Sequence, residues 1–121
     1  GAAAPGGLNG RGGLELIENL EAGCAGLIVA PDTADHQHAV YQAWRRGDAE
    51  LAMRRYAGVL PAIVFAMQSL DTLICYGKRI AALRMGMDLA QVHDRQPALQ
   101  PSAFGLAMAR RHAARLGPLR T

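Results

Sequence analysis

A short apolar run at residues 27–30 (LIVA) constrains the fold of this chain more than any other feature. Pro31 closes the run, and its residues do not alternate between apolar and polar. Such a pattern indicates a strand buried on both faces, which is typical of parallel sheets. A single strand of this kind cannot satisfy its main-chain groups or cover both faces without neighbours. We therefore expect its partner strands to come from residues outside this chain, or from another chain.

The residues before this strand predict a turn and a short helix. Residues 5–13 (PGGLNGRGG) form a glycine-rich turn. Gly23 stands where a residue in the left-handed region would end the helix that follows. The apolar positions of that amphipathic helix have helical spacing: Leu14, Leu16, Ile17 and Leu20.

Residues 32–70 predict two helices. The first begins at a cap formed by Asp32 or Thr33 and runs to Arg46. After Gly47, Asp48 caps the second, which continues to about residue 70. Pro61 lies inside this second helix, and proline removes a hydrogen bond and clashes with the preceding turn. We expect a kink or a break near residue 58.

Two further helices are predicted after residue 70. One spans residues 71–85 and ends at Gly86. Residues 88–101 hold two prolines and are predicted to form a loop. Ser102 caps the last helix, which ends near Arg115 before Gly117.

Charge and composition argue against a nucleic-acid or membrane partner. The net charge is +3 in 121 residues, which is one small domain at most. A nucleic-acid surface would gather cations on one face with aromatic residues between them, and this sequence does not. The longest apolar stretch, residues 59–67, is far shorter than the ~20 residues that span a membrane. The paired arginines are predicted to lie on solvated helix faces: Arg45 and Arg46, Arg54 and Arg55, and Arg110 and Arg111.

The two cysteines favour a reducing, cytoplasmic environment. Cys24 and Cys75 lie far apart, each in an apolar run, so we expect buried, unreactive thiols and no disulfide. No signal peptide is visible. The chain opens at Gly1 without a methionine and reads like a sequence entered in its middle.

Five motifs, in order, resemble one enzyme family. The segment 6–31 ends a helix in a Leu-x-x-Gly-x-x-Gly pattern before an apolar strand, and 39–65 holds a Gly-Asp turn and a Leu-Pro pair. Segment 77–87 (GKRIAALRMGM), the Arg-x-Pro loop at 95–97 and the final Arg-Leu-Gly complete the set. Together they resemble the C-terminal part of the dihydrodipicolinate synthase and N-acetylneuraminate lyase family, the class I Schiff-base lyases.

The resemblance implies an α/β fold, the C-terminal portion of a (β/α)8 TIM barrel plus a helical extension. A complete barrel of this type needs about 250 residues. Residues 1–46 would hold the end of the barrel, with the glycine-rich turn, helix 7, strand 8 and helix 8. Residues 47–121 would form the helical C-terminal extension. Within this chain the structure would be mostly α.

The resemblance also implies a function. Members hold a small 2-keto acid as a Schiff base on a lysine, with a tyrosine as proton relay; both would lie upstream, leaving this chain inactive alone. Neither a metal nor an organic cofactor is implied, and the full-length parent would be a homo-oligomer, tetramer or dimer. The substrate-binding residues implied here are Gly7, Asn9, Gly10 and Ile28. Aldolase, synthase and sugar-acid dehydratase chemistry all remain open.

Other candidate residues favour structural roles. Lys78, the only lysine, matches a structural lysine of the extension and not the catalytic one. His36 and His38 stand two apart and point to different helix faces, so solvent-facing histidines are expected instead of a metal site. The acids beside them, Asp32 and Asp35, are expected to cap the helix. Aromatic residues at helical spacing are expected to pack: Tyr41, Trp44 and Tyr56.

One alternative stays open. A chain that is mostly helical could be a non-catalytic helical protein-interaction module. The enzyme interpretation needs further strands upstream, whereas the module needs a chain that is monomeric and folds cooperatively by itself.

Overall fold

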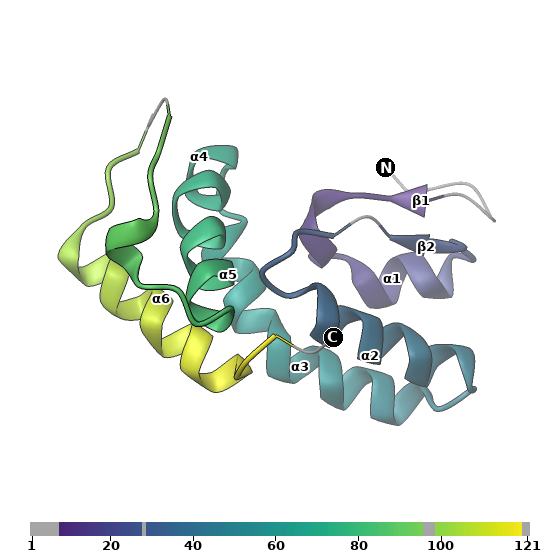
Figure 1. Cartoon of the computed structure of the whole chain (residues 1–121). Helices are drawn as coiled ribbons and strands as arrows, with labels where there is room; N and C mark the ends of the chain where they lie inside the picture. The colour runs from purple at the N-terminus through teal and green to yellow at the C-terminus, as the bar shows by residue number, and fades with distance from the viewer. Residues whose placement is uncertain (1–7, 28, 96–98, 120–121) are drawn as a thin grey trace.

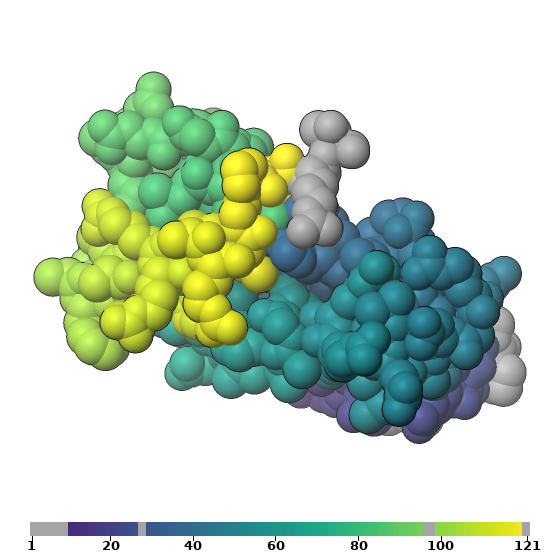
Figure 2. Space-filling view, turned by 90° about the horizontal axis from the view of Figure 1, so that it is seen from below, coloured from purple at the N-terminus to yellow at the C-terminus, as the bar shows by residue number. Residues whose placement is uncertain are grey.

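The computed structural model describes residues 8–27, 29–95 and 99–119, and this part of the chain is mostly helical (Figure 1). In Figure 2 the C-terminal helices gather at one end of the molecule and the N-terminal half at the other. The elements in order are β1 (Leu8–Asn9), η1 (Arg11–Gly13), α1 (Leu16–Glu21), β2 (Gly26–Leu27), α2 (Ala34–Arg45), α3 (Ala49–Ala66), α4 (Leu70–Thr72), η2 (Leu73–Gly77), α5 (Lys78–Arg84), η3 (Leu89–Gln91) and α6 (Ala103–Leu116).

The two short strands form a parallel pair joined through α1. Leu8 pairs with Gly26 and Asn9 pairs with Leu27. Figure 1 shows α1 and α2 on the same side of this pair. The expectation that the 27–30 strand finds its partner only outside the chain is therefore wrong, because residues 8–9, assigned to the turn, supply one.

The second strand is also shorter than predicted. It ends at Leu27, and neither Val29 nor Ala30 is part of a strand. Gly7 and Ile28, two of the expected substrate contacts, lie outside the described residues. Each strand has only one neighbouring strand and pairs with it over two residues. Few main-chain hydrogen bonds therefore hold the strands in an extended conformation.

The hairpin of α2 and α3 follows its sequence signals closely. Gly47, at φ +82°, ends α2, and the Asp48 carboxylate accepts a hydrogen bond from the Leu51 amide at 3.1 Å. The expected side-chain cap at the start of α2 is wrong. Thr33 stands at the N-cap, but its hydroxyl accepts from the side-chain Nε2 of Gln37 at 2.9 Å instead of capping the main chain.

Of the kink or break expected near residue 58, the break does not occur. Helix α3 runs from Ala49 to Ala66 through Pro61. Both Pro61 and Ala57, whose carbonyl loses its helical partner to the proline, are exposed. Water can hydrogen bond to that carbonyl on the exposed face, which lowers the cost of keeping the helix continuous.

The helical run predicted for residues 71–85 is present, but its middle is a π-helix. The run passes through α4, η2 and α5 and starts at a capping box of Ser69 and Thr72. The final helix, α6, begins where predicted, with the Ser102 hydroxyl accepting from the Gly105 amide at 2.9 Å. Inside the predicted loop, η3 adds one turn.

One buried cluster joins the helices. Tyr56 packs inside it, and the Tyr56 hydroxyl donates to the carbonyl of Leu14 at 2.7 Å. The two cysteines are buried and free, as predicted. The largest fully buried side chains of the cluster come from α1, α2, α3 and α5: Leu16, Val40, Val59, Ile63 and Ile80.

A search of the described residues found no single helix both long and apolar enough to cross a membrane. Helix α3 and the run from Leu70 to Arg84 reach that length and apolarity only as a pair, and the pair is bent by 105°.

Candidate functional site

The glycine-rich turn is held by α2 and α3. Arg11, Gly12 and Gly13 all have positive φ, at 68°, 63° and 91°. The carbonyl of Gly12 accepts from the side-chain Nε2 of Gln37 at 2.8 Å, and the carbonyl of Gly13 accepts from the Tyr56 hydroxyl at 2.9 Å. Gly13 lies at positive φ, and a Cβ on it would lie 1.8 Å from the Gln37 Oε1 atom, so any other residue there would be strained. Hydrogen bonds from α2 and α3 to the carbonyl groups of the turn hold it against these helices.

Two of the four expected substrate contacts are described. Asn9 belongs to β1, where it pairs with Leu27, and Gly10 follows directly after it. The main chain of both therefore lies at the carboxyl end of a parallel strand, next to the carboxyl end of its neighbour. Ligands of open and closed α/β sheets bind at this end of the strands.

A polar cluster joins the start of α2 to the end of α5 and to the C-terminal tail. Arg84 donates to both carboxylate oxygens of Asp35, to the carbonyl of Asp32 at 2.7 Å and to that of Gly117 at 2.6 Å. The Arg84 side chain is fully buried and that of Asp35 is 7% exposed. Asp35 lies in the first turn of α2, where an acid was expected, and its carboxylate pairs there with an arginine from another helix.

Asp32 is buried in the same cluster. Burial raises the pKa of its carboxyl to about 6, against the main-chain amides of Asp32 and Thr33 and the charge of Arg84, which lower it. Only 2% of the residue is exposed. A carboxyl with such a pKa changes charge slightly below neutral pH, and nothing in the sequence pattern indicated this.

The two histidines beside this cluster lie in different surroundings. His38 is exposed, as predicted, whereas His36 is half-buried and its ring lies 2.8 Å from the carbonyl of Leu116, to which it donates. No group of three or more metal-binding side chains was found within the described ranges.

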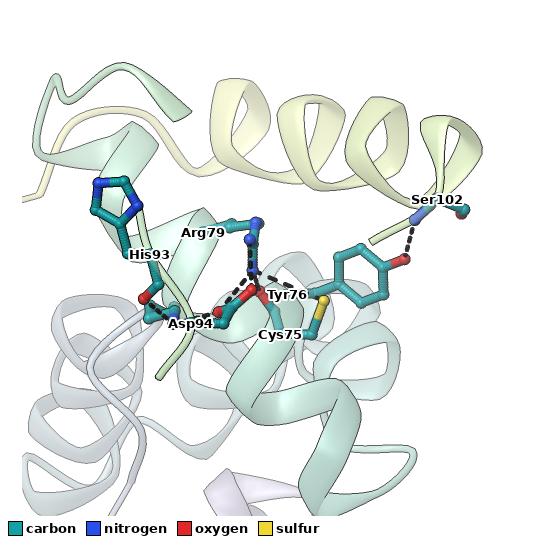
Figure 3. A network of polar contacts seen from close by, with 7 residues as sticks. Cys75, Tyr76, Arg79, His93, Asp94 and Ser102 are labelled. Atoms are coloured by element: carbon teal, nitrogen blue, oxygen red, sulfur yellow. Dashed lines mark hydrogen bonds and ion pairs between the residues drawn. The ribbon is translucent and has the colours of Figure 1, made fainter. Parts of the chain in front are cut away.

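A second polar network surrounds Asp94 (Figure 3). Arg79 donates to both of its oxygens, at 3.2 and 2.8 Å, and Lys78 is ion-paired with it. Hydrogen bonds from Arg79 and then from Lys78 hold the pKa of Asp94 down at about 2. The amine of Lys78 also donates to the carbonyl of His93 at 2.9 Å. These contacts give Lys78 a structural role, fixing the 93–94 segment against α5.

The π-helix η2 places two further groups beside this network. Arg79 donates to the Cys75 carbonyl at 2.9 Å, and burial raises the pKa of the Cys75 thiol, which makes a reactive thiolate less available. The Tyr76 hydroxyl accepts from the Ser102 amide at 3.2 Å (Figure 3). The network therefore ties η2 and α5 to the residues before α6.

The paired arginines lie on exposed faces, as predicted from their pattern. The buried arginines Arg79 and Arg84 were not singled out by the sequence. Both sit among apolar residues, and their acid partners lie 15 and 49 positions away. No family model and no curated protein matches this chain.

Proposed function

We propose that this chain is the C-terminal part of a class I lyase that forms a Schiff base with a small 2-keto acid. The observation that carries the proposal is the parallel pairing of β1 with β2, which are connected through α1 and followed by α2. This is the order of elements expected for the end of a TIM barrel. The three helical segments after α2 agree with the extension that the sequence resemblance implies.

The shortness of the two strands supports the proposal that they are part of a larger sheet. It has two residues in each strand, and α1 and α2 lie on the same side of it. Parallel sheets are stable when several strands pair and both faces are covered. Further strands would come from a longer protein, in which the lysine and tyrosine of the reaction would lie upstream of residue 1.

The expected substrate contacts fit this placement. Asn9 and Gly10 lie at the carboxyl end of β1, and in a barrel that end faces the active site. With Gly7 and Ile28 they would line the pocket for the keto acid. Lys78, held by Asp94 and the His93 carbonyl, would not form the Schiff base. The parent would be cytoplasmic and a tetramer or dimer.

A second candidate is a non-catalytic helical interaction module. The observation that favours it is the single buried cluster shared by α1, α2, α3, α5 and α6, which this chain builds from its own residues. A module of this kind would fold alone, whereas the barrel fragment would leave its strand edges unpaired.

Borohydride trapping with pyruvate tests the lyase proposal. A lysine amine and the ketone of pyruvate condense to an imine with loss of water, and borohydride reduces the imine to a stable secondary amine. We expect mass spectrometry to find this adduct on a longer protein that contains this segment, and none on residues 1–121. A Lys78→Arg variant of the longer protein should keep the adduct. An adduct on Lys78, or none on the longer protein, would contradict the proposal.

A further inference from the structure

A cavity of about 560 Å³ lies between the segment that follows β2 and one face of the helical run from η2 to α5. Small-molecule sites usually measure roughly 300–1,000 Å³. Its walls are mostly apolar, and they come from three parts of the chain: Ala30 and Pro31 after β2, Leu73, Ala81, Ala82 and Met85 on the helical run, and Met87, Val92 and Leu119 around them.

Small residues on one helix face create the space. Leu73, Gly77, Ala81 and Met85 follow one another at intervals of four, so they lie along the same side of the run. Ala81, in the middle of this row, carries only a methyl group, and a longer side chain there would fill the hollow. The space therefore depends on the small size of the side chain at this position.

Two of the ionisable side chains that border the cavity, Lys78 and Asp32, already have partners, and the third belongs to His93. Lys78 is ion-paired with Asp94 and bonded to the His93 carbonyl. The carboxyl of Asp32 interacts with main-chain amides and with the charge of Arg84. An anion beside the buried carboxyl of Asp32 would be repelled by it. A charged ligand of either sign would also lose its hydration against a mostly apolar wall, whereas a neutral, apolar ligand would not.

Two methionines at the edge of this cavity are exposed to solvent. Met85 is 58% exposed and Met87 is 39% exposed. Methionine side chains are flexible and adapt to irregular apolar partners. Covering them together with the apolar wall would remove hydrophobic surface from water, which favours occupation of the cavity.

We propose that this cavity is a binding site for a neutral, largely apolar small molecule. Asn9 and Gly10, the expected keto-acid contacts within the described residues, do not line this cavity, and binding there needs no Schiff base. Its failure would leave the proposed lyase function untouched, and the reverse also holds.

Three probes of one shape test the charge preference: cyclohexanol, cyclohexylamine and cyclohexanecarboxylate. Each is titrated near neutral pH while the methyl resonances of Ala81, Ala82 and Leu119 are followed by NMR. We expect cyclohexanol to shift these resonances in a saturable way, and both charged probes to bind at least about tenfold more weakly. Unshifted resonances up to the solubility of cyclohexanol, shifts spread equally over the chain, or equal binding of a charged probe would each overturn the proposal.

A filled cavity provides the matched control. Ala81→Leu places a larger side chain in the hollow and should weaken cyclohexanol binding at least about tenfold. Ala107→Leu makes the same change at an exposed position of α6 outside the cavity and should bind as the parent does. Unchanged binding in Ala81→Leu would contradict the assignment, and the probe series on the parent remains decisive should this variant not fold.

Discussion

Arg84 and Asp35 form a buried two-pronged ion pair between the end of α5 and the start of α2, 49 residues apart. The Nη1 atom of Arg84 lies 2.7 Å from one oxygen of Asp35, and Nη2 bonds to the other. Because Arg84 also bonds to the carbonyls of Asp32 and Gly117, one guanidinium joins the segment after β2, α5 and the tail. This contact fixes the strand-bearing half of the chain against the C-terminal helices.

Breaking this ion pair should destabilise the chain strongly. Asp35→Asn leaves the buried guanidinium of Arg84 without its counter-charge, and we expect a loss of about 3 kcal/mol in the free energy of unfolding. Urea unfolding followed by circular dichroism measures it. Glu15→Gln is the matched control, because the ion pair of Glu15 with Arg11 is exposed and should contribute less than about 0.5 kcal/mol. Equal effects of the two substitutions would contradict the role of Arg84.

Asp32 should make stability depend on pH between about 4 and 6. Its pKa is about 6 in the folded chain against an ordinary 3.8, so the folded state binds the proton more tightly. This group's contribution is fully present below pH 4 and is lost as the pH rises through 6. Asp32→Asn removes that loss, so its stability relative to the parent should rise by on the order of 2 kcal/mol from pH 4 to pH 7. A stability difference that stays constant over this range would contradict the assignment.

Asp94 should make the stability fall as the pH falls, which is the opposite of the effect of Asp32, and it should do so at lower pH. Arg79 and Lys78 hold its pKa at about 2, below the ordinary 3.8. Its contribution is therefore present above pH 4 and is lost as the pH falls towards 2. Asp94→Asn should flatten the pH dependence of the unfolding temperature in this window alone. An unchanged slope below pH 4 would show that the network seen in Figure 3 adds no stability.

Gly105 should not tolerate a side chain. A Cβ there would lie 2.0 Å from the Tyr76 hydroxyl, so Gly105→Ala should cost about 1–3 kcal/mol by forcing α6 away from η2. Gly58→Ala is the control, since its Cβ would meet nothing within 4 Å on α3 and should stabilise the helix by about 0.5–1 kcal/mol. Urea unfolding of both variants measures the difference. Two changes of the same sign would contradict this packing.

The helix limits could be predicted because their signals are local. Asp48 and Ser102 cap the helices that follow them, and Gly47 ends the one before, as their positions indicated. Of the kink or break expected near residue 58, the break was wrong, because the sequence does not show that Pro61 and Ala57 lie on the exposed face of a continuous helix. The π-helix at residues 73–77 has no comparable local signal.

The buried polar groups could not be predicted because their partners are distant in sequence. Asp35 resembled a capping acid and Arg84 an ordinary helix residue until the fold brought them together. For the strands, the apolar run at 27–30 indicated a parallel sheet, and β2 does pair in parallel. Its partner at residues 8–9 was hidden inside a glycine-rich stretch that reads as a turn.

We propose that β1 and β2 belong to a larger sheet, with further strands outside residues 1–121. Sedimentation velocity and thermal unfolding of residues 1–121, over a wide range of concentrations, test it most directly. Unpaired strand edges and an uncovered sheet face predict self-association, with an unfolding temperature that changes with concentration. A monomer at every concentration, with one sharp transition that does not move, would contradict the claim and favour the helical module.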